Sequence, residues 1–202
     1  MPIAPPPTTR LEAFTDAVVA IALTIMVLEL RPSDVVDQPT LAAALRIFGS
    51  KFLVYSLSFV VILRIWINHH RLLETAHHTT TAMFWLNGLL LFWLTLIPFA
   101  TALLGVDPLR PLAAAAYGTV MAMTSVAFSV LRFHVLGGPA RPGAERVVSP
   151  VFVRLSAAAI LPYLLAVPLA FISSKLSLAI FIAMPVALFA MDAAIPPGHD
   201  QP

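Results

Sequence analysis

The first hydrophobic segment of this chain is bounded by two acidic residues that could take part in ion chemistry. Asp16 and Glu29 enclose twelve uncharged residues, which give only about 18 Å of helix at a rise of about 1.5 Å per residue. This is short for a helix that faces lipid, because a charge at mid-bilayer costs roughly 2.5 to 3.5 kcal/mol on insertion scales. The pattern therefore favours a helix inside a bundle or beside water and makes the segment a candidate conduction pathway. The alternative, that both acids lie at the two membrane interfaces, stays open.

Helical periodicity groups three branched apolar residues of this segment on one face. They are Ile21, Ile25 and Leu28, with Thr24 about 60° to one side. Around an axis, such side chains would form a dewetting constriction, and Thr24 would add a hydroxyl beside it. Asp16 lies about 140° around the helix from Ile21, so we expect it to point into surrounding protein and brace the helix. Ordinary core packing also produces apolar stripes of this kind and remains an alternative.

A polar stretch after the second apolar segment, WINHHRLLETAHH, contains two pairs of histidines. The pairs His69 and His70 and His77 and His78 share a helical face, a pattern that could bind a transition metal or sense protons. Because Glu74 is the only carboxylate nearby, we expect no metal here. The histidines are better interpreted as partners of the acid in the first segment or as solvated loop residues.

Composition and hydropathy predict an all-α membrane protein. Of the 202 residues, 59% are hydrophobic and 11% are charged, about half the charged share of a soluble domain. The apolar residues form six blocks of roughly twenty, each long enough to cross a hydrocarbon core of about 30 Å as a helix. We expect one domain over residues 1–202 with six transmembrane spans at about 11–30, 41–68, 82–104, 112–136, 151–172 and 176–195. No small-residue cleavage site follows the first block, so we expect a retained span rather than a signal peptide.

The distribution of basic residues predicts the orientation in the membrane. Six spans place both termini on one side, and seven arginines fall on that side against five basic residues opposite. The first group is Arg10, Arg64, Arg71, Arg132, Arg141, Arg146 and Arg154, and the second is Arg31, Arg46, Lys51, Arg110 and Lys175. We therefore expect cytoplasmic termini.

Several function classes lack the residues that they require. There is no phosphate-binding glycine loop, no usable Ser/His/Asp grouping and no HExxH pattern, so we expect neither an enzyme nor a cofactor. A net charge of +2 is too small to suggest nucleic acid. The TVGYG filter of ordinary potassium channels and the repeated arginines of a voltage sensor are also missing from the sequence.

Three sequence motifs resemble a known family. RLEAFTD at 10–16 resembles the R-x-x-x-F-S-D signature that opens the first helix of the transmembrane-protein-175 family, the bacterial relatives of a lysosomal potassium channel. WINHHR at 66–71, and WLN at 85–87 followed by PFAT at 98–101, are similar to that family's second and third helices. Thr15 stands where the family usually has serine, and since both carry a hydroxyl we expect its packing role to survive.

The resemblance implies a homotetramer in which four copies of the first helix surround a potassium-conducting pore. The family's narrowest apolar ring lies five residues beyond the motif aspartate and corresponds to Ile21, followed by rings at Ile25 and Leu28. The hydroxyl associated with potassium preference corresponds to Thr24. The polar network that holds the pore helix in the family corresponds to Arg10, Phe14, Thr15 and Asp16 with the candidate partners Trp66, His69, His70 and Asn87.

We therefore expect a passive, potassium-selective channel of the bacterial plasma membrane with a hydrophobic constriction. Its expected partners are further copies of itself, membrane lipids and potassium ions. Three alternatives stay open. The histidine pairs could serve a proton-conducting or pH-sensing protein, and kinked helices with an intramembrane acid also suit a secondary transporter, although no internal repeat is found. A structural subunit would carry no flux at all.

Overall fold

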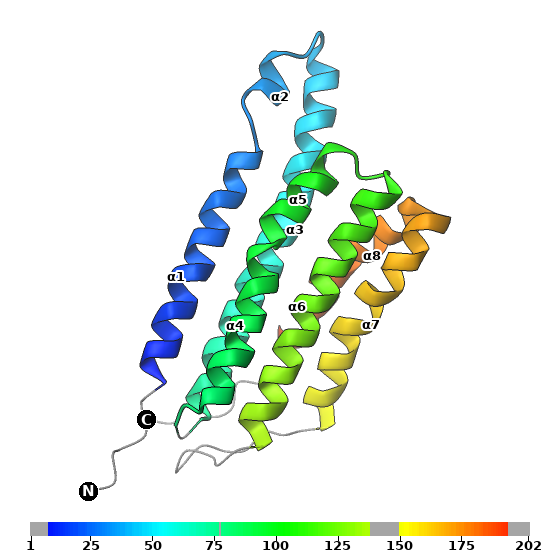
Figure 1. Cartoon of the computed structure of the whole chain (residues 1–202). Coiled ribbons are helices and arrows are strands. Elements are labelled where there is room, and N and C mark those ends of the chain that lie inside the picture. The colour runs from blue at the N-terminus through cyan, green and yellow to red at the C-terminus, as the bar shows by residue number, and fades with distance from the viewer. Residues whose placement is uncertain (1–7, 77, 138–149, 194–202) are drawn as a thin grey trace, which may run out of the picture.

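The computed structural model describes residues 8–76, 78–137 and 150–193, and the elements within these ranges are all helices (Figure 1). In chain order they are α1 Thr9–Met26, the 3-10 turn η1 Val27–Glu29, α2 Ser33–Val36, α3 Leu41–Glu74, α4 Thr81–Thr95, α5 Ile97–Val106, α6 Pro111–Gly137, α7 Pro150–Ile172 and α8 Ser174–Ala193. The all-α prediction is confirmed. His77, Arg141 and Arg146, which the sequence singled out, lie outside the described residues.

Most of the helices are long and apolar enough to cross a membrane. Four segments of the described chain meet that condition: Thr9–Val36, Leu41–Glu74, Thr81–Val106 and Pro111–Gly137. Two further apolar stretches, Ala159–Ile172 and Ser174–Leu188, are shorter. They belong to α7 and α8, which contain 23 and 20 residues. The chain is therefore a membrane protein whose six predicted spans coincide with seven of these helices, because the third span contains both α4 and α5.

The helices form one bundle, and α1 lies at its edge (Figure 1). α1 packs against α3, α4 and α5, whereas α6 packs against α4, α5, α7 and α8. At the opposite edge lie α7 and α8. The N-terminal helix is thus held along one side only within a single chain.

Two boundaries differ from the sequence prediction. α3 continues past the expected end near Asn68 to Glu74, so His69 and His70 lie within a helix rather than after it. The predicted span 82–104 consists of two helices, because the chain turns at Leu96 and α5 starts with a proline in its first turn. Proline has no backbone N–H to continue the hydrogen-bond ladder of the preceding helix, whereas its fixed φ suits the start of a new one.

Small and polar side chains join the middle helices of the bundle. The Thr101 hydroxyl donates to Ser58 Oγ at 2.7 Å, and Ser58 Oγ lies 3.1 Å from the Tyr117 hydroxyl. All three residues are buried, and they link α3, α5 and α6. At Gly118 an added Cβ would lie 3.2 Å from Val167 and 3.3 Å from Phe181, so glycine allows α7 and α8 to approach α6 closely.

Candidate functional site

The two sides of α1 have different surroundings. The buried residues recur every three or four positions and face α3, α4 and α5. They are Leu11, Thr15, Val19, Ala22 and Met26. The remaining side of the helix carries the candidate constriction and is not covered by this chain. The helix therefore has one packed face and one open face.

The candidate constriction residues lie on the open face. Ile21, Ile25 and Leu28 are 57%, 48% and 69% exposed, and Thr24 is exposed beside them. Leu28 lies in η1, just beyond the end of α1. The Thr24 hydroxyl donates to the backbone, with Ala20 O at 2.9 Å and Ile21 O at 3.0 Å. Its proton is thus used within the helix, while its oxygen lone pairs remain available on the open side.

A buried hydrogen-bond chain ties the packed face of α1 to α4 and α3. The Asn87 amide donates to Thr15 Oγ1 at 2.9 Å, and Asn87 Oδ1 lies 2.8 Å from His69 Nε2. The Thr15 hydroxyl donates its one proton to Leu11 O at 2.9 Å, so it must accept from Asn87. The amide oxygen of Asn87 then faces His69, which must carry its proton on Nε2. All three side chains are almost fully buried, and every hydrogen bond in this chain has a consistent direction.

A second contact joins α1 to α3. Trp66 Nε1 donates to Asp16 Oδ1 at 2.7 Å. A hydrogen bond to an ionised carboxylate is stronger than one between neutral groups. The carboxylate of Asp16 is thus turned toward α3 and away from the line of Ile21 and Leu28.

Three other residues of the expected network are not joined to it in the described part of the chain. Arg10 and Phe14 are exposed at the start of α1. His70 lies on the exposed side of α3, where its Nε2 is 3.4 Å from Glu74 Oε1. These three side chains are accessible to contacts from outside the subunit.

The histidine-rich stretch does not assemble a metal site in the described residues. No group of three or more histidine, cysteine, aspartate or glutamate side chains is close enough there to hold an ion. His78 and His134 line one cavity with Thr80, whose hydroxyl lies 3.2 Å from His134 Nε2.

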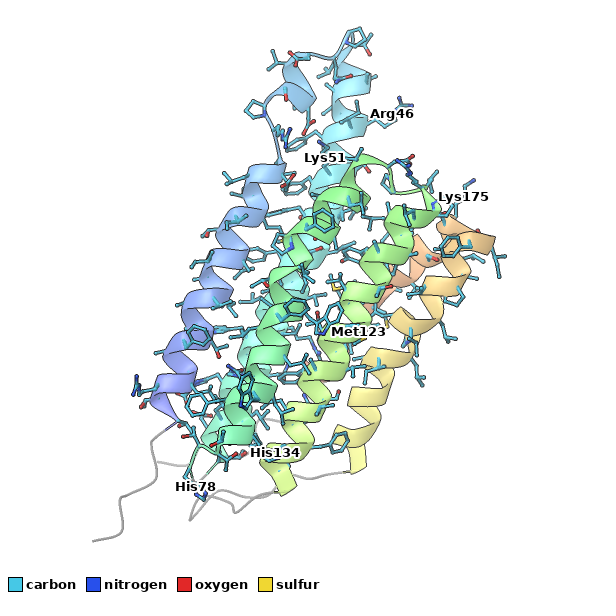
Figure 2. The ribbon with its side chains drawn as sticks, viewed as in Figure 1. Arg46, Lys51, His78, Met123, His134 and Lys175 are labelled. Atoms are coloured by element: carbon cyan, nitrogen blue, oxygen red, sulfur yellow. The ribbon has the colours of Figure 1, made fainter. Side chains whose placement is uncertain are left out.

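One polar contact near α1 was missed from the sequence. Lys51 Nζ lies 2.7 Å from Asp34, at the end of the bundle opposite the start of α1 (Figure 2). The two residues are 17 positions apart on either side of a turn. The one available signal was that an acid and a lysine flank neighbouring spans on the same side of the membrane.

Comparison with known proteins places the chain in a family. The family model for the endosomal/lysosomal potassium channel TMEM175 matches residues 10–98. A protein named as a potassium channel in Chryseobacterium sp. (strain P1-3) is 39% identical over 122 residues, 60% of this chain and 62% of that protein. Another, from Streptomyces collinus, is 32% identical over 176 residues, 84% of this chain and 85% of that protein. The match to the Chryseobacterium relative thus spans less than two thirds of its length, while the Streptomyces relative is matched over most of its length.

A solved structure and a human protein extend the comparison. The crystal structure of a lysosomal potassium-selective channel TMEM175 homolog from Chamaesiphon minutus matches with a TM-score of 0.78 and 31% identity, covering 93% of this chain and 98% of that chain. The human endosomal/lysosomal proton channel TMEM175 is 35% identical over 99 residues, which is 45% of this chain and 20% of the human protein. These matches confirm the resemblance predicted from the sequence motifs: the chain belongs to the TMEM175 family.

Proposed function

We propose that this chain forms a homotetrameric channel of the bacterial plasma membrane that conducts potassium passively through an axial pore lined by α1. The observation that carries the proposal is the open face of α1, on which Ile21, Thr24, Ile25 and Leu28 are exposed while the other face is packed. The names of the bacterial relatives, which are called potassium channels, support it. So does the likeness to the potassium-selective homolog from Chamaesiphon minutus.

The open face of α1 also suits contact between subunits. Ala13, Ala17 and Ala20 are exposed on that side at helical spacing. Small residues let membrane helices approach closely. Arg10 and Phe14 share this side of the helix, and we assign them to contacts with a neighbouring subunit. Four copies of α1 around an axis would then bring the apolar side chains together.

Conduction through such a pore follows from the chemistry of its lining. Ile21, Ile25 and Leu28 would form rings that exclude water when narrow, so the constriction acts as a hydrophobic gate. Isoleucine cannot coordinate a dehydrated cation. Selectivity then depends on pore width and on hydrated ions that meet the lone pairs of Thr24. No energy source is needed because ions move down their electrochemical gradient.

The hydrogen bonds on the packed face would keep the pore at a fixed diameter. Thr15 and Asp16 attach α1 to α4 and α3 through Asn87 and Trp66. Both attachments lie in the first half of the helix. We assign cytoplasmic termini because more basic residues lie on the terminus side.

One bilayer experiment tests the proposal. The purified chain is reconstituted into planar bilayers with potassium chloride on one side and sodium chloride on the other. We expect unitary currents that reverse close to the potassium equilibrium potential. Reversal near zero would rule out potassium preference, and an absence of unitary currents would rule out a channel. Saturable, coupled flux in liposomes would instead indicate a secondary transporter.

Proton conduction is a second candidate, and the name of the human relative favours it. His69 is joined through Asn87 to the packed face of the pore helix, so a titratable group lies directly behind that helix. A pH gradient applied without potassium separates the two cases. A reversal potential that follows the proton gradient would establish proton conduction, whereas currents that vanish without potassium would exclude it.

A further inference from the structure

The segment that follows α1 is fastened to α3 by a closely paired salt bridge. Lys51 Nζ lies 2.7 Å from both carboxylate oxygens of Asp34, and the backbone N–H of Arg31 donates to Asp34 Oδ2 at 3.1 Å. The side chains of Lys51 and Asp34 are only 17% and 16% exposed. Three charge-assisted hydrogen bonds thus converge on one carboxylate.

Between the Asp16 contact and this salt bridge, α1 has no other polar attachment in the described part of the chain. The hydroxyl of Thr24 bonds its own helix. Ala22 and Met26 pack against the bundle through apolar contacts alone. Apolar contacts lack the directionality of hydrogen bonds, so they fix the position of a helix less strictly. The second half of α1, which carries Ile25, and the following turn η1, which carries Leu28, are therefore positioned by apolar packing and by the attachment at the end of η1.

The link between Leu28 and the salt bridge is short. Only five residues separate Leu28 from Asp34. They include part of the 3-10 turn η1, the first residue of α2, and Pro32, whose ring fixes one backbone angle. A displacement of Asp34 would therefore pass to Leu28 rather than be absorbed by a flexible loop.

Residues of η1, α3 and α5 lie around the Lys51 side chain. The lysine stem passes alongside α5, where a Cβ added at Gly105 would meet Lys51 Cγ at an ordinary van der Waals distance of 3.4 Å. Lys51 also lines a cavity of about 130 Å³ together with Glu29, Tyr55 and Thr101. The ammonium group is thus held by the Asp34 carboxylate of α2, and it does not extend freely into solvent.

We propose that Asp34 and Lys51 are positioning residues for the pore: their salt bridge sets where Ile25 and Leu28 stand and thereby sets the unitary conductance. The inference rests on the proposed channel function. Neither residue needs to touch the permeating ion. The pair acts through η1, as a second attachment at the end of α1 that the Asp16 and Thr15 contacts do not reach.

Two conservative substitutions and their combination test this pair. Asp34→Asn keeps an acceptor for the Arg31 N–H but removes the charge, and Lys51→Met keeps the apolar stem. We expect each single variant to lower the mean unitary potassium conductance by roughly twofold or more. A contact that is weakened by about 0.5 kcal/mol changes a rate constant by about twofold. The double variant should match either single variant, since both remove one shared interaction. Lys51→Arg should restore a conductance near that of the wild type.

Matched controls distinguish an effect of the helix position on conductance from an effect of surface charge. Asp37→Asn and Arg46→Met remove one charge each at the same end of the bundle (Figure 2 for Arg46), and both residues are exposed. All variants are also measured in about 1 M KCl, where the Debye length is only about 3 Å. A positional effect should persist in high salt and be absent from both controls. Additive effects, loss of the effect in high salt or an unchanged conductance would each overturn the proposal.

A measurement without ion flow distinguishes this inference from the channel proposal. Amide hydrogen exchange of residues 27–36 is compared between the wild type and the two single variants in the full-length protein. We expect faster exchange there in both variants and unchanged exchange over residues 11–20. If the wild type conducts no potassium, the channel proposal fails, and unchanged exchange in residues 27–36 would still reject the attachment independently.

Discussion

The two faces of α1 both carry apolar side chains but differ in how they are held. On the packed face, Thr15 takes part in a buried hydrogen-bond chain with Asn87 and His69. On the open face, the side chains of Ile21 and Leu28 have no hydrogen-bonding groups, and both are more than half exposed. One helix thus combines a directional attachment with an unsupported apolar surface.

Under the proposed function, this difference leads us to expect that stability and conduction depend on separate residues of the same helix. A substitution on the packed face removes partners from buried polar groups, so it should lower the stability of the fold and of the assembly. A substitution on the open face changes the surface that four copies would turn toward the pore, so its cost falls on ion flow. We therefore expect that the two faces can be changed independently.

The largest effect is expected for Asn87→Leu on the packed side. The substitution leaves the Nε2–H of His69 and the oxygen of Thr15 without their partner in a buried site, at a cost of about 1 to 3 kcal/mol. We expect a lower thermal denaturation midpoint in detergent and a smaller tetramer peak in size-exclusion chromatography. Asn68→Leu is the matched control, because within the described residues the Asn68 amide bonds the Arg64 carbonyl of its own helix and no other helix. Equal stability of the two variants would contradict the bracing role of Asn87.

A smaller loss is expected for Asp16→Ala, because the contact with Trp66 is more exposed than the Asn87 chain. Removing the acceptor should cost under about 1 kcal/mol per subunit and should reduce the tetramer peak. Asp16→Asn keeps an oxygen that can accept from Trp66 Nε1. We expect it to retain most of the tetramer. A full tetramer with normal current in Asp16→Ala would reject the brace.

A polar substitution on the open face should raise the current instead of lowering stability. Ile21→Asn places an amide at the proposed constriction, and we expect it to raise the current by wetting the pore, about tenfold if the barrier falls by about 1.4 kcal/mol. Ile21→Val keeps the ring apolar and should change the current much less. The tetramer peak of both variants should match the wild type. Unchanged unitary conductance in Ile21→Asn would count against this gate.

Much of the fold could be predicted from the sequence, because continuous apolar blocks identify membrane helices. The turn at Leu96 could not, since hydropathy is continuous across it and only the missing N–H of Pro98 marks the break. The contact of Thr101 with Ser58 was also missed. The two residues are 43 positions apart, and the PFAT motif that contains Thr101 gives no indication of its partner.

The sequence alone did not show which side chains of α3 pair with α1 and α4. Trp66, His69 and His70 were all expected as partners for the start of α1. Consecutive residues on a helix point about 100° apart, so His69 and His70 cannot both face α4. The structure brings His69 to Asn87 and leaves His70 beside Glu74. That choice depends on how far α3 is rotated in the bundle, which is a tertiary property.

The smallest effect is expected for Thr24→Val on the open face. The substitution keeps the size of the side chain and removes the oxygen lone pairs proposed to meet hydrated ions. We expect the potassium preference over sodium to fall by about twofold to fivefold, equivalent to less than about 1 kcal/mol, as measured from the reversal potential under opposed potassium and sodium gradients. Thr95→Val is the matched control, because Thr95 is also exposed and its hydroxyl also bonds its own helix, at Phe92 O. If both threonine variants shift the reversal potential equally, the effect comes from general changes in packing, and contact of Thr24 with hydrated ions is rejected. If only Thr24→Val shifts it while the tetramer stays intact, the open face sets selectivity without contributing to assembly.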